Sequence, residues 1–65
     1  MTKTELKKRI AELYTELSNI YDEILEESNR GYKTNWAYLG ILEHNLAVGE
    51  SILEGYQEQL AALSA

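Results

Sequence analysis

Side chains that could carry out catalysis are few and scattered in this sequence. The chain contains no cysteine and one histidine, His44, so thiolate nucleophiles and thiolate zinc sites are excluded. The positions about one helical turn from this histidine hold Gly40, Ile41, Ala47 and Val48. None of them is an acid that could orient the imidazole. We expect His44 to be a surface or boundary residue, with a ligand or pH-sensitive contact as the alternative.

The spacing of the acidic side chains does not indicate catalysis or metal binding either. Neither His-Glu-x-x-His nor Glu-x-x-His occurs, which removes the usual helix-borne metal sites. Glu26 and Glu27 are adjacent, and adjacent side chains on a helix point apart. No glycine-rich loop precedes a helix, as a phosphate-binding site would require. The sequence therefore predicts a protein that is not an enzyme and that holds no cofactor and no metal.

Two helices must position every side chain of interest. Thr2 and Glu5 have the spacing of a capping box, which starts a helix. An apolar seam with alternating intervals of three and four follows, as in a coiled coil. Its members are Leu6, Ile10, Leu13, Leu17, Ile20 and Ile24. Gly31 is placed to end this helix in a left-handed conformation, and Thr34 or Asn35 is expected to cap the next one.

The second helix has a seam of its own, with the same spacing. Its members are Leu39, Leu42, Leu46, Gly49, Leu53, Tyr56, Leu60 and Leu63. The two predicted helices cover about residues 3–29 and 35–63, and the short connection makes them antiparallel neighbours. The sequence thus predicts one all-α domain over residues 1–65, an antiparallel helical hairpin.

Each helix also carries a second row of mostly apolar residues beside its seam, so its apolar arc spans about 180°. The rows are Ala11, Tyr14, Ser18, Tyr21 and Leu25, and Tyr38, Ile41, Asn45, Val48, Ile52 and Gly55. Two helices can cover only one stripe each, and a chain this short buries only about 60 % of its unfolded surface. We therefore expect a homodimer, a four-helix bundle.

The residues expected to mediate self-association are Tyr14, Tyr21, Leu25, Tyr38, Ile41, Val48 and Ile52. Two alternatives remain, in which the second rows stay partly exposed or belong to a different protein. Gly40, Gly49 and Gly55 each disfavour the helix by about 1 kcal/mol relative to Ala. They indicate close helix crossings, or simple tolerance of glycine.

The charges are unevenly distributed. The chain carries six bases and eleven acids, a net charge of −5, which argues against nucleic acid as a partner. From Thr34 onward the acids are Glu43, Glu50, Glu54 and Glu58, and the basic side chains all precede them. The basic start and the acidic end could neutralise each other across the hairpin. Alternatively, the acids form a surface for a basic protein, or the bases bind nucleic acid.

Trp36 marks the candidate surface for a partner protein. It lies away from both rows of the second helix, on the side that holds Gly40, Glu43, Ala47, Glu50 and Glu54. Tryptophan is enriched among residues that dominate binding energy, and the small neighbours would admit a helix or loop. The alternative is that Trp36 folds over the open end of the bundle with Tyr32.

The hairpin layout resembles that of plasmid RNA-binding hairpin dimers and of small hairpin phosphatases of sporulation regulators. The first family presents a basic face, whereas Glu dominates the helix faces here. The second family carries Ser-x-x-Leu-Asp, and the nearest stretch here, residues 51–54, places its acid one position earlier. The resemblance therefore implies an architecture and not an activity.

The sequence predicts a small acidic interaction protein. We expect it to self-associate and to bind and modulate another protein, as an inhibitor, antitoxin, adaptor or phage-encoded antagonist of a host factor does. The alternative is a regulatory nucleic-acid-binding hairpin dimer that would use Lys3, Lys7, Lys8, Arg9, Arg30 and Lys33. The longest stretch free of charged residues and histidine has nine residues, less than half of a membrane span of about twenty. An intracellular location is the default expectation.

Overall fold

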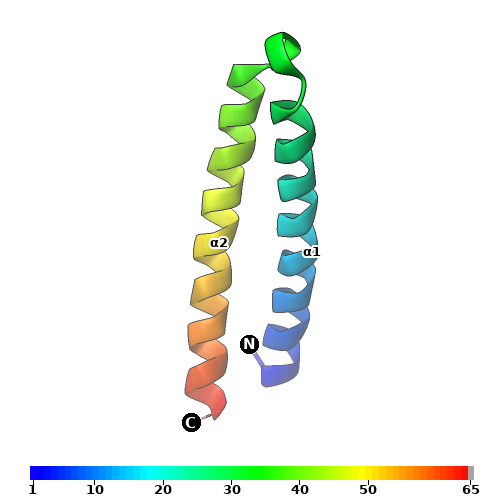
Figure 1. Cartoon of the computed structure of the whole chain (residues 1–65). Coiled ribbons are helices and arrows are strands. Elements are labelled where there is room, and N and C mark those ends of the chain that lie inside the picture. Colours follow the sequence, from blue (N-terminus) through cyan, green and yellow to red (C-terminus); the bar gives the residue numbers. More distant parts are fainter. Residues whose placement is uncertain (65) are drawn as a thin grey trace.

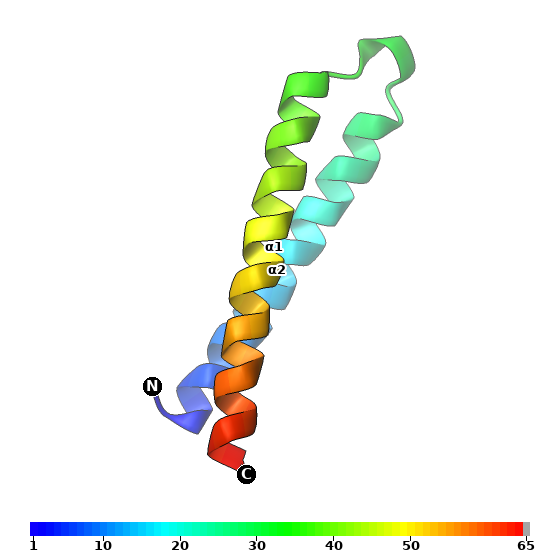
Figure 2. The ribbon, with the colours of Figure 1, turned by 90° about the vertical axis from the view of Figure 1, so that its left-hand side faces the viewer.

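The chain forms a helical hairpin, as predicted. The computed structural model describes residues 1–64. Helix α1 (Lys3–Ser28) is followed by the short 3-10 turn η1 (Gly31–Lys33) and by helix α2 (Trp36–Ser64). The two helices pack side by side in opposite directions (Figure 1), and Figure 2 shows that they cross at a shallow angle. The result is a rod of 50 × 15 × 14 Å.

The start of α1 confirms the predicted cap. The Oγ1 atom of Thr2 accepts a hydrogen bond from the backbone N–H of Glu5 at 3.1 Å. The Thr2 hydroxyl in turn donates to the Glu5 carboxylate at 3.2 Å. The carboxylate thus bonds the capping hydroxyl, where a standard capping box would have it accept the Thr2 backbone N–H.

The connection between the helices differs in detail from the prediction. Gly31 has a φ of +64° and is left-handed as expected, but it opens η1, because α1 already ends at Ser28. Asn35 caps α2, since its Oδ1 atom accepts the N–H of Tyr38 at 3.1 Å. Thr34 does not cap α2, because its hydroxyl donates to the backbone carbonyl of Glu27 at 3.1 Å. The turn is therefore tied back to the last turn of α1.

The two predicted seams meet between the helices. Their most deeply buried side chains are Leu6, Leu17, Leu39 and Leu42. At Gly49 the helices approach so closely that a Cβ atom there would lie 2.6 Å from Cδ2 of Leu17, which confirms a close crossing at that glycine. At Gly40 and Gly55 a Cβ atom would meet nothing within 4 Å, so close approach does not explain them within the hairpin.

The last member of the second seam is an exception. Leu63 is 54 % exposed, although its spacing continues the seam. Figure 1 shows that the end of α2 extends past the beginning of α1, which leaves the last turn without a neighbouring helix. Periodicity predicts which way a side chain points on its helix, but burial also requires something to pack against.

Candidate interaction surfaces

One face of the hairpin carries a line of exposed apolar side chains from α2. Tyr38, Ile41, Val48 and Ile52, here called the aliphatic row, are between 42 and 57 % exposed. The exposed polar residue Asn45 lies in the middle of the same line. The row extends over roughly 21 Å along the helix axis. Nothing within the described hairpin covers it.

The edge of α1 beside this row is acidic. The hydroxyl of Tyr38 donates to the Glu23 carboxylate at 3.0 Å. Further along, the row borders an open hollow of about 210 Å³. The hollow is lined by Arg9, Glu12, Leu13, Glu16, Ile52 and Tyr56. We call the aliphatic row together with Arg9, Glu12, Glu16 and Glu23 the aliphatic face.

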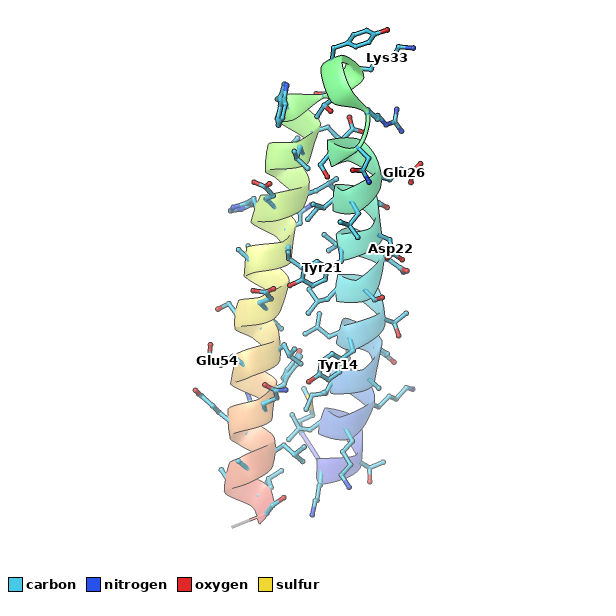
Figure 3. All side chains as sticks on the ribbon, viewed as in Figure 1. Tyr14, Tyr21, Asp22, Glu26, Lys33 and Glu54 are labelled. Carbon is cyan, nitrogen blue, oxygen red and sulfur yellow. The ribbon has the colours of Figure 1, made fainter. Side chains whose placement is uncertain are left out.

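A second surface carries the aromatic residues of α1. Tyr14, Tyr21 and Leu25 are exposed, and Figure 3 shows the two tyrosines pointing across the hairpin toward α2. The Tyr21 hydroxyl donates to Oε1 of Glu50 at 2.9 Å, and the Gln57 amide donates to the Tyr14 hydroxyl at 2.9 Å. An open hollow of about 350 Å³ lies between these side chains. We call Tyr14, Tyr21, Leu25, Glu50 and Gln57 the tyrosine face.

The two faces lie on opposite sides of the hairpin. On α2, Glu50 and Gln57 stand on one side of the seam, whereas the aliphatic row stands on the other, by the rotation of about 100° per residue. The hydrogen bonds agree, since Tyr21 reaches Glu50 while Tyr38 reaches Glu23. The residues predicted from the sequence to mediate self-association are therefore divided between two surfaces. One copy of the chain packed on one face cannot cover both.

The hydrogen bonds change the acidity of two tyrosines. The carboxylate of Glu50 accepts the hydroxyl hydrogen of Tyr21 and repels the phenolate, which raises the pKa of Tyr21 above its usual value. Glu23 raises the pKa of Tyr38 in the same way. Both hydroxyls thus stay protonated and act as donors to α2 and α1, respectively.

The residues predicted to bind a partner form an exposed strip on α2. We call Trp36, Gly40, Glu43, Ala47, Glu50 and Glu54 the Trp36 strip, and all of them are exposed. Trp36 is 71 % exposed and Tyr32 is 94 % exposed, so these two aromatic residues do not close the end of the hairpin. Glu50 belongs to both this strip and the tyrosine face, because its carboxylate reaches Tyr21.

A buried carboxylate holds the turn together, and the sequence interpretation did not identify it. Glu27 is only 6 % exposed. Its Oε1 atom accepts the backbone N–H of Asn35 at 2.7 Å, and its Oε2 atom lies 3.0 Å from Nε of Arg30. Glu26 is a more distant neighbour of the same guanidinium, at 4.0 Å. The sequence feature that could have indicated this role is a glutamate shortly before a predicted turn that contains an arginine.

The six basic residues predicted for nucleic-acid binding are divided between the two ends of α1: Lys3, Lys7, Lys8 and Arg9 lie at its start, and Arg30 and Lys33 lie at the turn. Arg30 is engaged by Glu27, and the ammonium of Lys33 lies 5.8 Å from the ring centre of Tyr32. Within residues 1–64, no ion pair shorter than 4.0 Å joins the basic start of α1 to the acidic end of α2. Direct pairing across the hairpin therefore does not neutralise these two ends.

Two further kinds of feature, a metal-binding cluster and a membrane-spanning helix, are not found in the part of the chain that the structure describes. Residues 1–64 contain no group of three His, Cys, Asp or Glu side chains that could hold a metal ion. No helix within them is both long and apolar enough to cross a membrane. Comparison with family models, curated proteins and solved structures found no match to this chain.

Proposed function

We propose that this chain is a non-enzymatic interaction protein that self-associates and also binds and modulates another protein. The supporting observation is the distribution of its large apolar side chains. Within residues 1–64, eleven of them are exposed, whereas four apolar side chains are buried. A small domain with so small a core commonly gains stability by association. Exposed apolar rows of this length are typical of interaction surfaces.

We assign self-association to the tyrosine face, with the Trp36 strip of a second copy as its counterpart. A two-fold axis parallel to the helices would place α1 of one copy over α2 of the other, as in an antiparallel four-helix bundle. Such an axis keeps each residue at its height along the rod, and the hydrogen bonds place Tyr21 level with Glu50 and Tyr14 level with Gln57. The ring of Tyr21 would then lie about one helical turn from Ala47 of the second copy, and the ring of Tyr14 about one turn from Glu54.

Charge supports this pairing. Lys7 lies two turns before Tyr14 and shares its side of α1, and Glu54 and Glu58 are the acids nearest the end of α2. In the proposed dimer the basic start of α1 would lie near the acidic end of the partner's α2. The unpaired charges at these two ends of the single hairpin would thus partly offset each other between copies, and added salt would weaken this effect.

Two matched variants test the assignment. Leu25 and Ile41 are 61 % and 57 % exposed, and they lie on opposite faces. Size-exclusion chromatography with light scattering should give a mass near twice 7.4 kDa for the parent chain. Leu25→Glu should shift that mass to the monomer, and Ile41→Glu should not. Dissociation by Ile41→Glu alone would instead place the dimer contact on the aliphatic face.

A further inference from the structure

We propose that the aliphatic face binds an amphipathic helix of another protein, with an apolar stripe and a basic flank. This inference rests on the proposed function as a protein-binding chain, but not on self-association. The mode is a helix laid along a hydrophobic surface, with anchors spaced by three and four residues. The aliphatic row matches a partner segment of about four helical turns.

The charges on the two edges of the row differ. The edge formed by α1 contains the carboxylates Glu12, Glu16 and Glu23 and the guanidinium of Arg9. Glu5 and Lys8, which adjoin Arg9 and Glu12, offset each other, so the edge remains acidic. At the turn, the positive charge of Arg30 is balanced by Glu27 and, at longer distance, by Glu26. The other edge, on α2, has no acidic or basic group besides His44; it consists of Ala37, His44, Ser51 and Gly55. A partner helix would therefore place Lys or Arg on its α1 side and uncharged residues on the other.

The hollow at the end of the row fits a long basic side chain. Leu13 and Tyr56 are half-buried there, whereas Glu12 and Glu16 are exposed beside them. Lys and Arg lay their aliphatic stems on apolar surface while the charged head stays near water or an acid. The volume of about 210 Å³ gives such a stem room. Glu12 and Glu16 would attract the charged head, whereas the like charge of Arg9, which also lines the hollow, would oppose it.

A second copy of this chain is a poorer occupant of this face. Stacking two aliphatic faces by a two-fold axis would bring the acidic edge of α1 against the partner's acidic edge, or against its apolar row. Like charges at close range are unfavourable, and so is burial of carboxylates against aliphatic side chains. A basic helix removes both conflicts.

Two designed peptides test the inference on the full chain. Both are fluorescently labelled amphipathic helices with leucines at heptad a and d positions; one carries lysines on a single flank and the other glutamates at the same positions. Fluorescence anisotropy should show binding of the lysine peptide, with the glutamate peptide at least about tenfold weaker. This ratio should fall as salt is raised. Equal affinity for both peptides would overturn the inference.

Matched variants locate the site. Val48→Asp and Glu16→Lys should each weaken the lysine peptide at least about tenfold. Asp22→Lys, with the same charge change at an exposed residue outside the three named surfaces, should have little effect. Circular dichroism melts confirm that each variant is folded. The monomeric Leu25→Glu chain should still bind. Absence of peptide binding while the parent chain remains dimeric would refute this inference and leave self-association standing.

Discussion

Gly49→Ala tests the closest contact in the hairpin. Alanine favours a helix over glycine by about 0.8–1.0 kcal/mol per residue. At Gly55 there is open space around the missing Cβ atom, so Gly55→Ala should stabilise the protein by that amount. In a domain of this size, 1 kcal/mol corresponds to an increase in Tm of about 4–8 °C. Gly55→Ala is therefore the control.

At Gly49 the same methyl group would lie 2.6 Å from Cδ2 of Leu17. Because Leu17 is buried in the seam, its side chain or the helices must shift. Overpacking of this kind costs about 1–3 kcal/mol. After the gain in helix propensity is subtracted, Gly49→Ala should change stability by between about 0 and −2 kcal/mol. The two alanine variants should thus differ in stability by about 1–3 kcal/mol.

Urea unfolding followed by circular dichroism measures this difference, at one protein concentration because association shifts apparent stability. In a Leu17→Ala background the clashing atom is gone, and Gly49→Ala should then become stabilising. Non-additivity of this kind is what contacting residues show. An equal gain for Gly49→Ala and Gly55→Ala in the parent chain would refute the close approach of α1 and α2 at Gly49.

Three further predictions follow from individual contacts. Glu27→Ala should destabilise the chain by about 2 kcal/mol, since it removes the charged acceptor of a part-buried hydrogen bond. Glu26→Ala should change urea stability by less than about 0.5 kcal/mol; equal effects would contradict the assigned role of Glu27. Tyr21 should ionise at higher pH in the parent chain than in a Glu50→Gln variant, by absorbance titration. Because its pKa is raised on folding, the bond contributes stability below about pH 10, and this is lost as pH rises further; an unchanged titration would argue against the bond. Trp36→Ala should leave the melt of the monomeric form within about 0.5 kcal/mol but weaken the dimer, so a sharp loss of stability would assign Trp36 to the fold.

The seams could be predicted because helical periodicity alone determines them. The deeply buried residues Leu6, Leu17, Leu39 and Leu42 all belong to the predicted seams. The need for glycine at position 31 followed from turn chemistry, and its φ of +64° confirms it. In each case the information lies within a few neighbouring residues.

The relation between the second rows could not be obtained from one helix at a time. A helical wheel gives the angle between Ile41 and the seam of its own helix. Which face of the hairpin Ile41 shares with residues of α1 depends on how the two helices are oriented. The bonds of Tyr21 to Glu50 and of Tyr38 to Glu23 show that relation. The role of Glu27 likewise depends on the path of the turn, which brings the N–H of Asn35 to its carboxylate.

Self-association is the central claim, and sedimentation equilibrium of the parent chain tests it most directly. The exposed apolar side chains predict a mass near twice 7.4 kDa at high protein concentration, with dissociation toward 7.4 kDa on dilution. A mass of 7.4 kDa at every concentration would contradict the claim, and the tyrosine face would then be exposed in the native protein.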